Sequence, residues 1–215
     1  MKTLLATIGF ACAVASSAAA TSFTVFTDRA SFDAAAGLTS FEDFNSVVGE
    51  PSFDGSDLTI GDLTLRNDNT LARGFIDQPP LQFSGFDVDG TAVANILVNS
   101  SSSFTLGFSS AVTAFGADFG AFNDGIQRSL FNVLGEDILA PVQSGSTVQF
   151  FGFISDTAFD TFSILSFEGA GDGFGLDNVS CGTAAAPVPL PAGVVLLLSG
   201  MGGMAALRRK KKATA

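Results

Sequence analysis

Short apolar segments alternate with polar breaks from residue 21 to residue 183. The segments are rich in Phe, Val, Ile, Leu and Thr, which favour strands, and the breaks contain Gly, Ser, Asn and Asp, which favour turns. Such dense spacing is typical of an all-β protein, and it predicts a single β-sandwich domain over 21–183. Strands are expected at 22–27, 58–65, 92–98, 103–108, 112–119, 129–134, 147–154, 161–167 and 174–181.

Two short segments depart from the strand pattern. Apolar residues recur at helical spacing in 28–36, and either Thr27 or Asp28 is a suitable N-cap. We therefore expect one short N-terminal helix. Residues 134–138 place a glycine between two apolar segments and predict a tight hairpin.

Residues 1–20 have the organisation of a secretory signal peptide. Lys2 supplies a positive charge, an apolar run follows, and the small residues Ala18 and Ala20 provide a cleavage site. We expect export of the protein and a mature chain that begins near Thr21.

The two cysteines do not predict a disulfide. Cys12 lies in the signal segment, where a lipoprotein signal is an alternative, but the aliphatic residue expected three positions earlier is missing. After removal of the signal, Cys181 is the only cysteine, and we expect a small buried side chain near a strand end.

The C-terminal part has the pattern of a membrane anchor behind a linker. Residues 184–187 are a linker, and 190–207 is uncharged and mostly apolar. As a transmembrane helix that segment would span about 27 Å, close to the thickness of a hydrocarbon core. The basic cluster should stay in the cytoplasm and leave the acidic domain outside, and a tail of 213–215 follows. This cluster consists of Arg208, Arg209, Lys210, Lys211 and Lys212.

A Pro-x-Pro motif stands at the entrance of this span, in the run Val188, Pro189, Leu190, Pro191 and Ala192. With the span and the basic cluster, it strongly resembles the PEP-CTERM sorting signal in its VPLPA-CTERM variant, over residues 188–212. The resemblance implies cleavage near the motif by an exosortase-type membrane protease. It also implies transient anchoring in the inner membrane of a Gram-negative bacterium and transfer to the cell surface or extracellular matrix. A plain membrane anchor is the alternative, and it leaves the Pro-x-Pro unexplained.

Composition narrows the chemistry that the domain can perform. The chain has no His, Trp or Tyr, so mechanisms that need an imidazole or a phenol are excluded. All 21 acidic residues lie in 21–187 with four arginines and no lysine, a net charge of −17, which opposes nucleic-acid binding. A carboxylate-only glycosidase is the remaining enzymatic alternative. No nucleophile-and-base or phosphate-binding motif accompanies the acids, so we predict a non-catalytic protein.

Glycine occupies every second position shortly before Asp177, at Gly169, Gly171, Gly173 and Gly175. In a strand these positions share one face, so another backbone or an ion can approach closely there. The segment 173–179 overlaps the repeat of calcium-binding β-rolls, although one copy cannot form a roll. It resembles more closely the last strand of the jelly-roll ectodomains common among PEP-CTERM proteins, with 41–44 as the early counterpart.

This second resemblance implies one structural calcium ion. In related carbohydrate-binding jelly rolls an early acidic residue and a late Asp share the ion, and Glu42 and Asp177 match those positions. Ca²⁺ takes about six to eight oxygen ligands, which carboxylates, loop carbonyls and water can supply. The alternative is that both acids cap turns or lie solvated on an acidic surface. Residues 87–90 also begin like a calcium loop, but Val98 stands where a Glu is needed, so a turn is predicted.

Two functional hypotheses stand beside the glycosidase. The first is an exported, non-catalytic protein with an adhesive or structural role at the cell surface or in its matrix. The second is a carbohydrate-binding module for the cell's own exopolysaccharide. Most of the 22 phenylalanines after the signal segment are expected in the core rather than as stacking platforms for sugars, and the missing Trp and Tyr weaken the second hypothesis.

Overall fold

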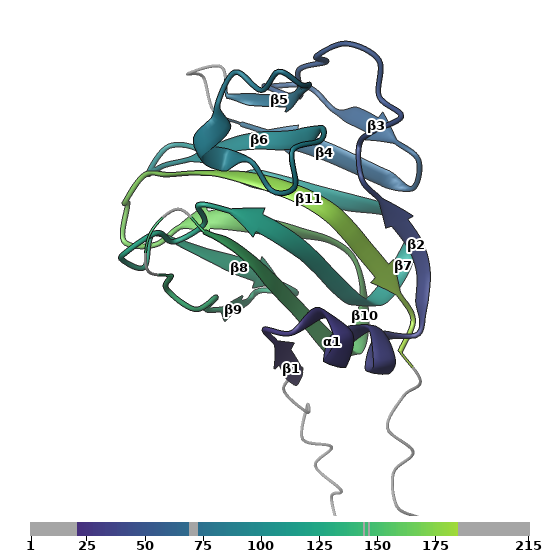
Figure 1. Ribbon diagram of the computed structural model, residues 1–215. Helices are drawn as coiled ribbons and strands as arrows, with labels where there is room; N and C mark the ends of the chain where they lie inside the picture. The colour runs from purple at the N-terminus through teal and green to yellow at the C-terminus, as the bar shows by residue number, and fades with distance from the viewer. Residues whose placement is uncertain (1–20, 69–72, 144, 146, 185–215) are drawn as a thin grey trace, which may run out of the picture.

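The computed structural model describes residues 21–68, 73–143, 145 and 147–184, which form a β-sheet domain with one short α-helix (Figure 1). The helix is α1 (Arg29–Ala36), and η1 (Ser84–Phe86) is a single 3₁₀ turn. The prediction of an all-β domain is therefore confirmed. The strands are β1 (Phe23–Phe26), β2 (Leu38–Glu42), β3 (Leu58–Ile60), β4 (Leu63–Asn67), β5 (Gly74–Asp77), β6 (Val93–Val98), β7 (Phe104–Gly120), β8 (Ser129–Val133), β9 (Glu136–Ile138), β10 (Val148–Ser166) and β11 (Asp172–Gly182).

Several strand boundaries differ from the prediction. Segments 103–108 and 112–119 form the single strand β7, and 147–154 and 161–167 form the single strand β10. Bulges in the pairing of these two strands absorb the polar residues that suggested a break. The segment 58–65, by contrast, is the hairpin of β3 and β4, and neither β2 nor β5 was predicted.

The long strands bend one sheet over a main hydrophobic core, and a second, small cluster of Phe32, Ala36, Ala114 and Phe150 lies under α1. The described strands follow the order β5-β6-β11-β7-β10-β8-β9, with β1, β2, β3 and β4 attached to this path. The first half of β7 pairs with β4 and its second half with β11, while β10 pairs with β1 near its start and with β8 near its end. Each long strand thus contributes to both halves of the folded sheet.

Phenylalanine fills the space between the two halves. The twelve largest fully buried side chains are all Phe. Phe115 from the middle of β7 lies 4.6 Å from Phe162 near the end of β10, and Phe131 of β8 lies 4.9 Å from Phe151, both between ring centroids. The expectation of a phenylalanine core is confirmed.

The helix and the hairpin arise from local sequence as expected. The Asp28 side chain caps α1 by accepting a hydrogen bond from the Ser31 N–H at 2.8 Å. Between β8 and β9, Leu134 and Gly135 both have positive φ, the backbone of a tight hairpin turn.

Both ends of the described chain lie at the same level of the sheet (Figure 1). Ala114 of β7 pairs with Gly182 on one side and with Ile154 on the other, and Ile154 pairs in turn with Thr24 of β1. The chain therefore enters and leaves the domain at one end.

Candidate functional site

The alternating glycines of β11 receive the backbone of the loop around η1. A Cβ atom at Gly175 would overlap the Phe86 carbonyl oxygen, and one at Gly120 of β7 would lie only 2.7 Å from the Asp87 carbonyl oxygen. Real side chains do not approach backbone this closely, so the loop lies flat on the sheet because these side chains are missing. The prediction that a backbone or an ion approaches this face is confirmed for a backbone.

A bulge at Asn178 decides which way Asp177 points. Asn178 has φ 51°, and the register with β7 shifts between Asp177 and Ser180. Val179 consequently points into the core, with only 1% of its side chain exposed. Asp177 keeps the outer face that it shares with Gly175.

Asp177 is fully buried on that face. Its Oδ1 accepts a hydrogen bond from the Asn178 N–H at 2.6 Å, whereas its Oδ2 has no hydrogen-bond partner in the described structure. Burial, together with the neighbouring charges of Asp89, Asp43 and Asp118, raises the pKa of Asp177 to about 8. Such a carboxyl group binds either a proton or a cation at neutral pH.

Arg29, which contacts the residue that follows Asp177, forms its ion pair and hydrogen bonds with other groups. Arg29 of α1 approaches Asp118 with 2.9 Å between Nη2 and Oδ2, and it donates to the Asn178 carbonyl and to the Ser180 hydroxyl. Its guanidinium also lies 4.7 Å from the centroid of the Phe150 ring. A pocket of about 300 Å³ opens beside this arginine, lined by Arg29, Asp33, Leu38, Phe41, Asp118, Asn178 and Ser180.

The turn predicted at 87–90 is confirmed, and it brings Asp89 to Asn178, the residue next to Asp177. Asp87 accepts a hydrogen bond from the Gly90 N–H at 2.7 Å, and Gly90 has positive φ. The Asn178 side-chain amide then donates a hydrogen bond to Oδ2 of Asp89 at 3.4 Å. Hydrogen bonds from Thr91 are the main reason that the pKa of Asp89 is lowered, so this neighbour stays charged.

The structure does not bring Glu42 and Asp177 together. Glu42 pairs with Val179 across the sheet, and directly opposed residues share a face, so Glu42 and Asp177 lie on opposite faces. The Glu42 carboxylate instead accepts a hydrogen bond from the Phe44 N–H at 2.7 Å. Its neighbour Asp43, not Glu42, acts on Asp177.

The oxygen atoms around Asp177 meet some, but not all, of the requirements of a calcium site. The unpartnered Oδ2 and the carboxylates of Asp43 and Asp89 supply the oxygen chemistry that Ca²⁺ prefers. However, no three acidic or cysteine side chains within the described ranges gather closely enough to hold a metal ion. A calcium ion here would take most of its ligands from backbone carbonyls and water.

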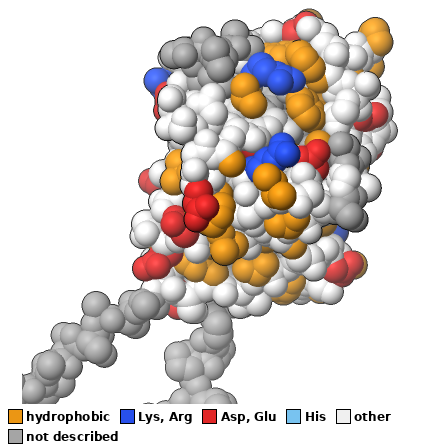
Figure 2. Space-filling view, turned by 90° about the vertical axis from the view of Figure 1, so that its left-hand side faces the viewer, with side chains coloured by type: hydrophobic (Ala, Val, Ile, Leu, Met, Phe, Trp, Pro, Cys, Tyr) orange, Lys and Arg blue, Asp and Glu red, His pale blue; other side chains and the backbone are white. Residues whose placement is uncertain are grey.

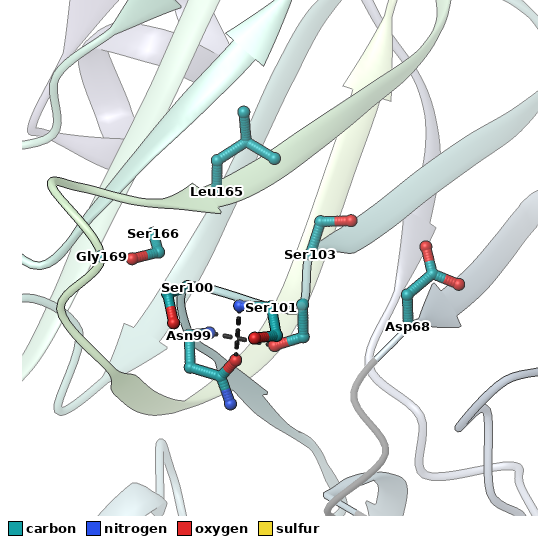
Figure 3. A pocket seen from close by; sticks show the side chains of 9 residues that line it. Asp68, Asn99, Ser100, Ser101, Ser103, Leu165, Ser166 and Gly169 are labelled. Atoms are coloured by element: carbon teal, nitrogen blue, oxygen red, sulfur yellow. Dashed lines mark hydrogen bonds between the residues drawn. The ribbon is translucent and has the colours of Figure 1, made fainter.

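A second pocket, of about 430 Å³, lies where β6 and β10 end (Figure 3). The Ser101 N–H donates to the Asn99 side chain at 2.9 Å, and the Asn99 N–H donates to the Ser102 hydroxyl at 3.0 Å. These bonds shape the loop and leave a hydroxyl-rich recess. Its lining comprises Asp68, Asn99, Ser100, Ser101, Ser102, Ser103, Leu165, Ser166 and Gly169.

One cluster of potential function was not predicted from the sequence. The guanidinium of Arg73 lies 4.1 Å from the ring centroid of Phe83 and 5.1 Å from that of Phe86, and all three side chains are half-buried. Phe83 precedes η1 and Phe86 ends it, so a Phe-x-x-Phe spacing was the only sign of this cluster in the sequence. It gave no sign of the arginine, which is held beside β6 by the hydrogen bond from the Leu97 N–H to the Arg73 carbonyl, while Asp77 holds Phe83.

The predictions for the two ends of the chain concern residues outside the described ranges. These are the signal peptide with Ala18 and Ala20, the sorting motif, the span at 190–207 and the basic cluster. Among the residues that are described, no helix is long and apolar enough to cross a membrane. Cys181 is free and buried, as expected, and burial raises the pKa of its thiol.

No protein-family model matches the chain, and no curated protein matches it.

Proposed function

We propose that the protein is an exported, non-catalytic surface domain, displayed by an exosortase-type sorting system and serving an adhesive or structural role. In this proposal the folded sheet is a jelly-roll-like sandwich ectodomain, 188–212 is the sorting signal, and the final location is the cell surface or the matrix. The observation that carries it is the arrangement of the chain ends. Both ends of the domain lie at the same end of the sheet, so one short tether can hold it without obstructing the opposite end.

The remote end of the sheet carries the surfaces suited to contact. The chain leaves the domain just after Gly182, at the end of β11. The hydroxyl-rich pocket lies near the start of β11, because Val98, which precedes the pocket residue Asn99, pairs with Asp172. Arg73 lies near the same end, because its carbonyl accepts a hydrogen bond from Leu97, which pairs with Gly173. A strand of this length covers about 35 Å. A domain tethered through Ala184 therefore presents these groups away from the membrane.

Replacement of both Pro189 and Pro191 by Ala should block sorting without affecting folding. We expect the double variant to remain in the inner membrane, while the parent is released with an N-terminus near Thr21 and no peptide beyond Ala192. Cell fractionation and mass spectrometry of released material, in cells that make an exosortase-type protease, provide the measurement.

Pro187→Ala is the matched control, because it removes a proline from the linker just before the motif. It should be released like the parent. Release of the double variant at the parental level, or a dominant intact form that retains Arg208, would reject the sorting role in favour of a plain membrane anchor.

A second role, binding of carbohydrate, is favoured by one specific observation. The half-buried rings of Phe83 and Phe86 form an aromatic cluster with the Arg73 guanidinium over it, and sugar sites commonly combine aromatic and polar groups in this way. Retention of the protein on immobilised polysaccharide tests this role, and passage through every matrix polymer without delay contradicts it.

A further inference from the structure

Arg73 is the one arginine of the domain without an acidic partner among the described residues. Arg29, Arg66 and Arg128 each form an ion pair with an aspartate. Arg73 forms none, and its side chain donates no hydrogen bond to a described residue, although its Nε is buried. An unpaired guanidinium is notable in a domain of net charge −17, where acidic partners are abundant.

The pKa of Arg73 agrees with the absence of an acidic partner among the described residues. Burial lowers the pKa of Arg73, and no carboxylate contributes an opposing effect. A partly desolvated cation without an acceptor is costly, and a bound anion would offset that cost.

The surrounding structure holds the cluster in place before any ligand binds. The Arg73 carbonyl accepts hydrogen bonds from the Asn67 side chain and the Leu97 N–H, both at 3.0 Å. On the other side, the buried Asp77 carboxylate accepts from the backbone N–H groups of Gln82 and Phe83 at 3.0 and 3.2 Å. Both the cation and the first ring are therefore fixed through their backbones.

The rings form a surface that remains open at its edge. Phe83 and Phe86 stack with an interplanar angle of 22°, and Phe75 meets Phe83 edge-on. Ser84 and Gly85 between the two stacked rings are exposed, and no atom within 4 Å opposes a Cβ at Gly85. On the face shown in Figure 2, a basic side chain near the top is bordered by hydrophobic ones.

We propose that Arg73, Phe83 and Phe86 bind a sugar ring that carries a single carboxylate, such as an isolated uronic acid unit of a polysaccharide. The inference rests on the carbohydrate-binding role described above and names its site and ligand class. The planar guanidinium binds a carboxylate through two parallel hydrogen bonds. The part of the ring surface that the guanidinium leaves uncovered contacts the C–H groups on the apolar face of a pyranose.

The charge of the domain limits the ligand further. A surface of net charge −17 repels a densely charged polyanion, whereas one carboxylate within a mostly neutral chain escapes most of this repulsion. The site therefore favours an occasional acidic unit over a continuous polyuronate.

An NMR titration of the full chain in polyoxyethylene detergent tests the site directly. The Nε–Hε signal of Arg73 is followed as cellobiouronic acid, cellobiose or acetate is added. We expect the uronic acid to shift this signal and to bind at least tenfold more tightly than either other probe. Arg73→Gln should weaken its binding at least tenfold, Arg73→Lys severalfold, and Phe83→Leu should weaken uronate binding but not acetate binding.

Arg66→Gln is the matched control, because it removes an exposed arginine that is paired with Asp57 and Asp68. It should bind cellobiouronic acid like the parent, and circular dichroism verifies that each variant is folded. An unmoved Arg73 signal, or equal losses in the Arg66 and Arg73 variants, would overturn the inference.

Two further outcomes separate the site from the role. Retention on polysaccharide that survives Arg73→Gln overturns the site but leaves the carbohydrate role standing. Binding of cellobiouronic acid at Arg73 without retention on any polysaccharide supports the site and overturns the role. Self-association that Arg73→Gln abolishes, seen by analytical ultracentrifugation, would instead assign the cluster to an interface between copies and overturn the inference.

Discussion

Gly175→Ala should destabilise the domain by about 3 kcal/mol, at the upper end of the cost of overpacking. The new methyl group would overlap the Phe86 carbonyl oxygen and lie 2.8 Å from a methyl carbon of Val93. Backbone cannot move aside as a side chain tip can, so the η1 loop must lift from the sheet. Phe86 would leave Arg73 as a consequence, and binding at the Arg73 cluster should weaken together with stability.

Urea unfolding followed by far-UV circular dichroism measures this effect, since the chain has no Trp or Tyr to provide a fluorescence signal. Gly171→Ala is the matched control from the same run of glycines, because the nearest atom to its added Cβ is 3.8 Å away, an ordinary contact. It should change stability by less than about 0.5 kcal/mol. Equal effects of the two substitutions would show that close approach of the loop is not what requires glycine.

The stability of the domain should decrease as the pH rises from about 4 to about 8 in the absence of divalent ions, because of Asp177. Its pKa is about 8 in the folded protein and near 3.8 in an unfolded chain, so the folded state binds the extra proton throughout this interval. The contribution is fully present below the unfolded pKa and is lost by the folded pKa. One proton gives a slope of at most about 1.4 kcal/mol per pH unit.

Asp177→Asn should remove most of this slope, because the amide imitates the protonated carboxyl group. A smaller slope of the same sign should remain, since burial also raises the pKa of Asp54 and of Asp172. Asp160→Asn is the control, because it removes one exposed carboxylate from β10. A slope that persists unchanged in the Asp177 variant would contradict this account.

Calcium provides a further test of the same carboxyl group. If Asp177 holds a structural Ca²⁺ whose other ligands are mostly backbone carbonyls and water, millimolar Ca²⁺ at pH 8 should raise the melting temperature by about 5 to 10 °C, as expected when the ion is a hundredfold above its dissociation constant. Mg²⁺ at equal ionic strength should give a smaller rise, because it demands a nearly octahedral shell. Equal effects of the two ions, or an unchanged response in Asp177→Asn, would leave the proton as the only occupant.

Local patterns in the sequence were sufficient for much of the fold. The strand-rich domain, the helix capped by Asp28, the turn at 87–90 and the close approach at the alternating glycines follow from periodicity, capping and backbone freedom. Each depends on neighbours within a few residues. Local reasoning failed where polar residues in the middle of β7 and β10 suggested turns, because bulges can accommodate such residues inside a continuous strand.

The sequence by itself determined that Asp177 ends a side-chain-free face and that mechanisms based on an imidazole or a phenol are excluded, because these follow from strand alternation and from the absence of His and Tyr. Only the tertiary structure decided which groups meet Asp177. The bulge at Asn178 separates it from Glu42 and leaves it near Asp43 and Asp89. Tertiary structure likewise placed Arg73 beside Phe83 and Phe86, because strand pairing and loop packing set these contacts and local sequence does not encode them.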